Sequence, residues 1–179
     1  MSSNVGLREE KGMPHGFMGK VLWVDLSNGR VWDEPLDEQL CRAYIGGYGI
    51  GARVLYDRMR PGVDPLGPEN ILGFLTGPLT GTPCIEGNRS VFVCKSPLTG
   101  GWGDANCGGT FGPHFKFAGY DGAFFVGRAD RPVYLYVENG RAEIRDATFL
   151  WGKDTNETED ALKQIHGPKT QVASIEIGR

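Results

Sequence analysis

Two stretches of the chain alternate hydrophobic and polar residues around an Asn-Gly pair. In residues 19–35, GKVLWVDLSNGRVWDEP, the apolar run VLWVDL is followed by Asn28-Gly29 and by the returning run RVWDE. Residues 132–147, PVYLYVENGRAEIRDA, repeat this arrangement around Asn139-Gly140. An Asn-Gly pair between two such runs is a strong signal for a type I′ turn. We therefore predict two β-hairpins, each closed by such a turn.

Helical sequence follows each of the two predicted hairpins. Residues 36–47 and 52–59 follow the first hairpin, and residues 154–167 follow the second. Asp154 and Glu157 have the spacing of a capping box, and Gly167 is a typical helix end. The repetition predicts a pseudo-twofold duplication of a hairpin-and-helix unit.

Further apolar runs between glycine-rich and proline-rich turns predict the remaining strands. These runs cover residues 71–77, 89–96, 122–128 and 171–177. The total is seven or eight strands, mostly in hairpins, with three helices. This pattern is typical of an α+β fold with largely antiparallel sheets and a few helices.

The stretch IGGYGIGA, residues 45–52, matches the dinucleotide-binding pattern GxGxxA at Gly47, Gly49 and Ala52. That motif requires a strand directly before it and an acidic residue about 20 positions later. Here the preceding residues are helical in character, and the later region is the turn-rich PGVDPLGPEN. We therefore favour tight helix packing at these glycines over dinucleotide binding.

Composition and charge argue against a nucleic-acid-binding protein and against a membrane-spanning one. The 179 residues have a net charge of −3 and a pI near 5.6, which argues against a nucleic-acid-binding face. No apolar run approaches the roughly 18 residues that a transmembrane helix needs, so we expect no membrane partner. Glycine occurs 28 times, against about 12 or 13 at average usage. The excess indicates many turns, or backbone that must approach something closely.

The termini and cysteines favour a cytoplasmic protein. Residues 1–16 are polar, lack the apolar core of a secretory signal and are predicted to form a flexible N-terminal arm. The four cysteines form no CxxC pair, so iron–sulfur and zinc spacings are absent and four reduced thiols are expected. The chain stops shortly after residue 177 without a cap or tail, so we expect that it is cut rather than finished.

Two places could hold an anionic ligand. Arg89 enters an apolar strand from a glycine turn, between the PLTG turns at 77–83 and 96–102, and an arginine fork suits a phosphate or a planar group. Asn106, Cys107, Gly108 and Gly109 carry short side chains and free backbone amides ahead of the helical sequence 110–119. Such a turn can cradle a phosphate, or it can simply lead into a buried helix. Cys107 has no histidine placed beside it by the sequence, so a catalytic thiol is not indicated.

These residues resemble the N-terminal domain of the aldehyde ferredoxin oxidoreductase family, the tungsten–bispterin enzymes. The resemblance runs from about residue 16 to about residue 175. It is carried by the order and spacing of GKVLWVDLSNG, YIGGYGIGARVLYDRM, VDPLGPENILGFLTGPLTGTP, GNRSVFVCKSPLTG, ANCGGTFG, KFAGYDGAFFVGRADRPVYLYV and AEIRDATFLWGK. It implies that residues 17–179 are a domain on which two pterins and one tungsten, or molybdenum, rest.

The resemblance also implies the chemistry and the contacts. The family oxidises aldehydes to carboxylic acids and passes electrons to ferredoxin. Arg89 matches an arginine that touches the cofactor, and Asn106 matches an asparagine at the pterin phosphates and their bridging magnesium. Cys107, Gly108 and Gly109 match the rest of that cradle. The iron–sulfur cluster and the catalytic residues of the family lie in later domains, so none is assigned here and this chain alone is not expected to be competent.

The departures leave alternatives open. The family's GGR is GNR here, and its NSGG is NCGG, which places a thiol in the cradle. A non-catalytic assembly module that no longer binds the cofactor is one alternative, and part of a related aromatic thioester reductase is another. The cofactor hypothesis predicts that Arg89 and Asn106 point into one accessible concave face. The partners expected are the remaining domains, ferredoxin or a similar acceptor, and a second copy of the chain through a bare apolar face.

Overall fold

A six-stranded sheet organises the part of the chain that the structure, a computed structural model, describes, residues 15–173. Its strand order is β2-β1-β6-β3-β4-β5, with a parallel pairing only between β1 and β6. The strands are β1 (Lys20–Asp25), β2 (Arg30–Pro35), β3 (Leu72–Thr76), β4 (Ser90–Lys95), β5 (Trp102–Cys107) and β6 (Gly122–Val126). The α+β class with largely antiparallel sheets is confirmed.

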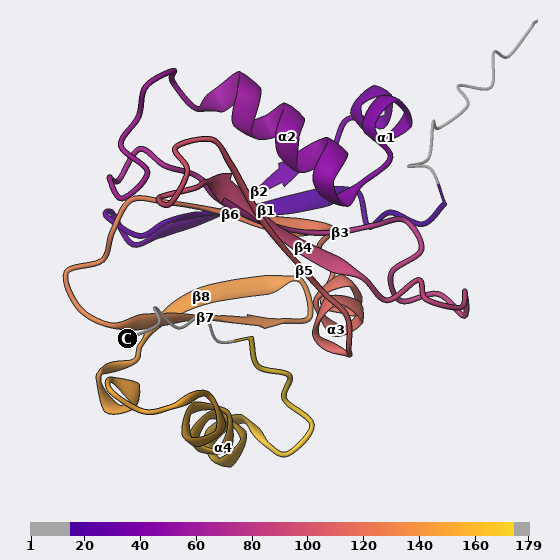
Figure 1. The fold of residues 1–179 in the computed structure, drawn as a ribbon. Coiled ribbons are helices and arrows are strands. Elements are labelled where there is room, and N and C mark those ends of the chain that lie inside the picture. Colours follow the sequence, from indigo (N-terminus) through magenta and orange to yellow (C-terminus); the bar gives the residue numbers. More distant parts are fainter. Residues whose placement is uncertain (1–14, 174–179) are drawn as a thin grey trace, which may run out of the picture.

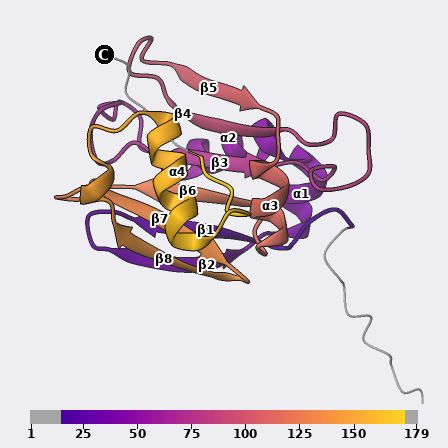
Figure 2. The same ribbon diagram turned by 90° about the horizontal axis from the view of Figure 1, so that it is seen from below.

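The other elements cover the two faces of this sheet. Helices α1 (Glu38–Tyr44) and α2 (Gly47–Arg58) lie on one face, and α3 (Phe111–Phe117) lies on the other with a separate hairpin, β7 (Val133–Glu138) and β8 (Arg141–Asp146) (Figure 1). A 3₁₀ turn (Thr148–Leu150) leads to α4 (Thr155–His166), which lies on the outer side of that hairpin (Figure 2). Among the described residues, no helix is long and apolar enough to cross a membrane.

The central strands are buried on both faces, which explains their unbroken apolar runs. In β1, Val21 and Trp23 face the core under α1 and α2, while Leu22 and Val24 face the core under α3 and the β7–β8 hairpin. The neighbouring β6 repeats this alternation, with Phe124 on the α1–α2 side and its neighbours on the other. The sheet therefore separates two hydrophobic cores.

Both predicted hairpins form, but their turns differ. Glu138 pairs with Arg141, so Asn139-Gly140 is a two-residue turn with positive φ at both positions, as predicted for type I′. In the first hairpin Asp25 pairs with Arg30, which leaves a four-residue loop, so the predicted two-residue turn is wrong. The Asp25 carboxylate accepts hydrogen bonds from the backbone of Ser27 and Asn28 and from the Asn28 amide. This side chain organises a wider loop than the Asn-Gly pair indicates.

The glycines of IGGYGIGA allow two helices and the sheet to meet at short range. Helix α1 ends at Tyr44 and α2 begins at Gly47, five residues earlier than predicted. A Cβ on Gly49 would lie 2.2 Å from the Tyr44 carbonyl oxygen, and a Cβ on Gly51 would lie 2.8 Å from the Val93 side chain. Tight packing is confirmed, and it outweighs the low helix propensity of glycine.

The structure differs from three further predictions about secondary structure. Residues 102–107 form the edge strand β5, which was not predicted because Gly, Asp and Asn are poor strand formers. The described residues form four α-helices, whereas the predicted total was three; the additional one, α3, lies in the sequence 110–119, whose helical character was noted but not counted. Residues 171–173 of the predicted last strand are not in a strand, and residues 174–177 lie outside the described residues. The predicted N-terminal arm also lies outside them, apart from residues 15–16.

The predicted duplication is only partly visible in the arrangement. Each hairpin is followed by helical structure, and the predicted capping box of α4 forms between Asp154 and Glu157. The first hairpin, however, belongs to the six-stranded sheet, whereas β7 and β8 form a sheet of their own. A duplication of the unit stays a prediction.

Candidate functional site

The β4–β5 pair decides which candidate side chains can act together. Val91 pairs with Asn106 and Ser90 pairs with Cys107, and directly opposed residues of two strands share one face. Val91 belongs to the core under α1 and α2, so the exposed Asn106 side chain lies on that side of the pair. Arg89 lies directly before β4 and two residues from Val91, so continuing the alternation of side chains by one residue assigns it to the same side.

Arg89 and the glycine turn line one depression in the surface. The lining residues are Glu86, Asn88, Arg89, Gly108 and Gly109, and the volume is about 430 Å³. The Arg89 guanidinium Nη1 lies 3.4 Å from the position that a Cβ would take on Gly108. Gly109 has φ +85°, where a side chain would be strained, and no atom lies within 4 Å of a Cβ built there. The backbone of Gly108 and Gly109 is therefore uncovered by side chains next to the Arg89 guanidinium.

Asn106 and Cys107 are placed differently from this group. Asn106 is exposed on the same side of the strand pair as Arg89 but does not line the depression. The Cys107 thiol faces the other way, with its sulfur 3.1 Å from the Ser90 hydroxyl on the side of α3. Only the backbone of Cys107 is then available to a ligand bound at Arg89.

A buried threonine, which the sequence analysis missed, holds Arg89 in place. Thr80 is 2 % exposed, its hydroxyl donates to the Arg89 carbonyl oxygen at 2.8 Å, and it accepts from the Gly77 backbone N–H. The Gly81 N–H donates to the Asn88 side chain. The first PLTG turn is thus joined to the GNR turn by side-chain and backbone hydrogen bonds. In the sequence, the repeated PLTG motif was the feature that could have pointed to this contact between Thr80 and Arg89.

A buried ion pair lies behind the PLTG turn and was also missed. The Lys116 ammonium donates to the carbonyl oxygens of Gly16 and Gly77, at 2.5 and 2.6 Å, and lies 3.8 Å from the Asp121 carboxylate. That carboxylate accepts from the backbone N–H groups of Met18 and Gly19. The pair therefore joins the entry of the chain, the PLTG turn and α3. A lysine inside the aromatic run HFKF was the signal in the sequence.

Burial sets the electrostatics of this pair. Lys116 and Asp121 are each 4 % exposed. Burial raises the pKa of the Asp121 carboxyl, although the backbone N–H groups and Lys116 act in the opposite direction. Burial likewise lowers the pKa of the Lys116 ammonium, against the effect of Asp121. Each charge is costly in this environment without the other.

The described residues offer no ligand set for a metal ion of their own. Within residues 15–173, no three His, Cys, Asp or Glu side chains are grouped closely enough to hold one. All four cysteines are free, and burial raises the pKa of Cys41 to about 11. A metal at the Arg89 depression would have to be held largely by groups that a ligand brings with it.

Comparisons with known proteins agree on one family. Residues 21–178 match the family described as aldehyde ferredoxin oxidoreductase, N-terminal domain. The chain is 48 % identical over 161 residues to a tungsten-containing aldehyde ferredoxin oxidoreductase of Pyrococcus abyssi, which covers 89 % of this chain and 26 % of that protein. It is 39 % identical over 156 residues to the WOR-like subunit of an aliphatic sulfonate oxidoreductase of Pyrococcus furiosus, covering 85 % of this chain and 25 % of that subunit.

A solved structure has the same fold. The active-site complex BamBC of benzoyl coenzyme A reductase, determined with 1,5-dienoyl-CoA, superposes with a TM-score of 0.84 at 39 % identity, over 87 % of this chain and 24 % of that one. The chain thus spans about a quarter of the length of the proteins that it matches. Because the family match extends over most of its residues, the chain belongs to the aldehyde ferredoxin oxidoreductase family and corresponds to its N-terminal domain.

Proposed function

We propose that this domain is the resting surface for a tungsten–bispterin cofactor and that the Arg89 depression receives a pterin phosphate. The observation that carries the proposal is the Arg89 guanidinium beside the bare backbone of Gly108 and Gly109. In the part of the chain that the structure describes, the guanidinium has no hydrogen-bond or ion-pair partner, so its donors are free for an anion. A guanidinium and backbone N–H groups are the usual donors to phosphate oxygens.

The residues around the depression suit such a group. A side chain on Gly108 would approach the guanidinium, so glycine keeps the space between backbone and fork open. Thr80 fixes the backbone of Arg89 and so limits the directions that the fork can take. Glu86 adds a carboxylate to the lining, and Asn106 offers an amide oxygen on the same side of the strands. Hard oxygen donors of this kind suit a magnesium ion that bridges phosphates, and we propose Asn106 as its ligand.

The reaction proposed for the whole protein follows its relatives. The bound tungsten–pterin group would supply the redox centre for oxidation of an aldehyde to a carboxylic acid. The described residues would bind and orient that group, and the rest of the protein would supply the iron–sulfur cluster and the contact with ferredoxin or a similar acceptor. We propose a cytoplasmic location, in which the free thiols stay reduced.

A second candidate is supported by the likeness to the benzoyl coenzyme A reductase complex. In that case the same depression would hold the cofactor of an enzyme that reduces an aromatic thioester. The two reactions are separated by assaying the full-length protein with an aldehyde and an artificial electron acceptor, and with benzoyl-CoA and a reductant. A scaffold that has lost its cofactor would show neither activity and would contain no tungsten or molybdenum.

The test of the depression itself is cofactor content. The full-length protein is purified without oxygen, and metal and pterin are measured per mole. Arg89→Gln removes charge-assisted hydrogen bonds worth about 1.5–3 kcal/mol, or roughly a 10- to 150-fold loss of affinity, so cofactor content should fall. Arg128→Gln changes an exposed arginine outside the depression and should leave it unchanged. Equal metal and pterin in the two variants would show that the phosphate binds elsewhere.

A further inference from the structure

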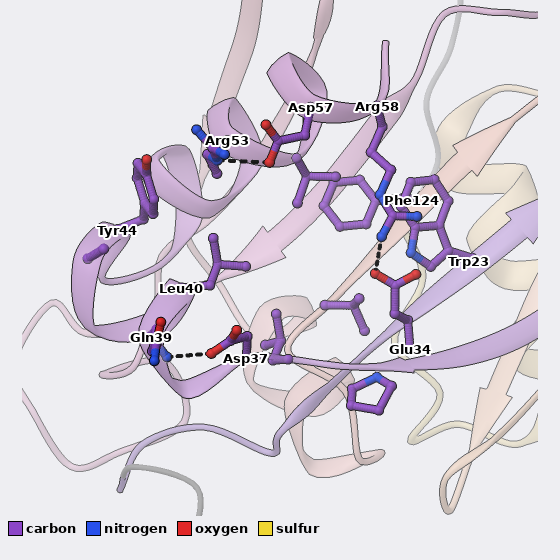
Figure 3. A pocket seen from close by; sticks show the side chains of 15 residues that line it. Trp23, Glu34, Asp37, Gln39, Leu40, Tyr44, Arg53, Asp57, Arg58 and Phe124 are labelled. Atoms are coloured by element: carbon purple, nitrogen blue, oxygen red, sulfur yellow. Dashed lines mark hydrogen bonds and ion pairs between the residues drawn. The ribbon is translucent and has the colours of Figure 1, made fainter.

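A second pocket lies on the other side of the domain from the β4–β5 edge, between the first hairpin and the helices α1 and α2. Its volume is about 530 Å³, within the range of small-molecule sites. Its floor is apolar and is made by the buried side chains of Val21, Trp23, Leu36 and Phe124. Figure 3 shows Trp23 and Phe124 side by side under α2, and their ring centroids are 4.9 Å apart. The floor suits an apolar or aromatic body.

The indole N–H of Trp23 has no acceptor. It is the one buried side-chain nitrogen or oxygen atom without a hydrogen-bond partner among the described residues, and Trp23 is only 4 % exposed. A buried donor of this kind is normally paired, and native proteins rarely leave one unsatisfied without a reason. In Figure 3 the indole nitrogen lies on the side of the ring toward Arg58 and Glu34, at the pocket. A ligand oxygen would supply the missing acceptor.

The charges at the mouth of the pocket are already paired. Arg58 binds Glu34, and Arg53 binds Asp57 at 2.8 Å. The Asp37 carboxylate caps α1 through the backbone N–H of Gln39. Among the described residues, the charged groups that line the pocket therefore all have partners, which favours an uncharged ligand. The Arg58 guanidinium also lies over the Trp23 ring, 5.1 Å from its centroid, and the indole nitrogen has almost no accessible surface, so a ligand must displace Arg58 to reach it. The ion pair and the cation–π contact are both partly exposed, and contacts of this kind contribute about 1 kcal/mol or less each.

We propose that this pocket binds a small uncharged molecule with an apolar body and one carbonyl oxygen that accepts from the Trp23 indole N–H. The proposal does not depend on the cofactor at Arg89, because the two depressions share no lining residue. The chemical class comprises ketones, aldehydes, esters and uncharged amides. The apolar body replaces water over Trp23 and Phe124, and the carbonyl satisfies the buried donor.

The test follows the indole N–H signals of ¹⁵N-labelled protein by NMR. The chain has four tryptophans, and the signal absent from Trp23→Phe identifies the indole of interest. Acetophenone is the probe, because it is uncharged and carries one carbonyl. Ethylbenzene is the matched control, since it has the same ring and size but no acceptor. Acetophenone should shift the Trp23 signal downfield and saturably, beyond the ring-current shift that ethylbenzene produces, because only acetophenone offers an acceptor to the indole N–H.

Two matched variants test the place of binding. Ala43 is exposed on α1 and lines the pocket, and Ala52 is exposed on α2 outside it. Ala43→Phe should fill the pocket and abolish the saturable shift, whereas Ala52→Phe should leave it intact. Equal responses to acetophenone and ethylbenzene, or an Ala43→Phe titration like that of wild type, would overturn the proposal. So would a Trp23 signal in the full-length protein that is already shifted and unresponsive, because another segment of polypeptide would then occupy the pocket.

Discussion

Replacing Asp121 by asparagine should destabilise the domain strongly, because it leaves the Lys116 ammonium buried without its counter-charge. The two charged groups are 3.8 Å apart, which corresponds to about 4 kcal/mol of attraction at an effective dielectric constant of about 20. Asparagine also presents an NH₂ group where Met18 and Gly19 donate from the backbone. Removing one partner of such a buried pair typically costs about 3–5 kcal/mol.

The loss is measured by urea unfolding and by thermal unfolding, both followed by tryptophan fluorescence. For a chain of this size, 3–5 kcal/mol corresponds to a decrease in Tm of roughly 6–20 °C. Asp130→Asn, which changes an exposed carboxylate, is the control and should lie within about 0.5 kcal/mol of wild type. In Lys116→Met/Asp121→Asn the two losses should not add, since neither charge is left alone. A loss below about 1 kcal/mol in Asp121→Asn would refute the view that this pair holds the chain entry to the PLTG turn.

Two other predictions concern the helices. Burial, with a neighbouring arginine, lowers the pKa of His166 below its ordinary 6.5, so the folded state prefers the neutral ring. Stability from this group is complete above about pH 6.5 and is lost as the pH falls toward the folded pKa. The urea midpoint of the wild-type protein should therefore drop between pH 7.5 and pH 5.0. The drop should be smaller in His166→Phe and unchanged in the control His114→Gln. Equal drops in the wild type and both variants would contradict this prediction. Gly49→Ala should cost at least about 2 kcal/mol, because its Cβ would lie 2.2 Å from the Tyr44 oxygen, while Gly101→Ala, with no atom closer than 3.8 Å, should be near neutral in the same assay.

The repeated hairpins show how far local sequence determines structure. Asn139-Gly140 closes a two-residue turn as expected, because the preference for positive φ at both positions is a property of those residues. Asn28-Gly29 has the same letters but forms a wider loop, because the carboxylate of Asp25 binds the loop backbone. A side chain three residues away was enough to change the turn.

The candidate site was found in sequence largely through its bare backbone and its arginine. A glycine in the sequence indicates a position where the backbone needs a positive φ or where another group approaches it closely. In the structure, Arg89, Gly108 and Gly109 line the same depression. The orientation of Cys107 could not be read in the same way, because it depends on the register between β4 and the unpredicted edge strand β5. One residue of register separates the faces that Asn106 and Cys107 occupy.

The sequence alone determined the fold class, the family resemblance and the strands and helices with strong periodicity, because these depend on local propensity and on the order of motifs. Only the tertiary structure decided which residues hold the site and which are left unsatisfied. Thr80 reaches Arg89 across nine residues, and Lys116 reaches Gly16 across 100. Among the described residues, the indole N–H of Trp23 has no hydrogen-bond partner because of what packs around it. Contacts between distant segments are set by how the layers stack, and no local pattern encodes them.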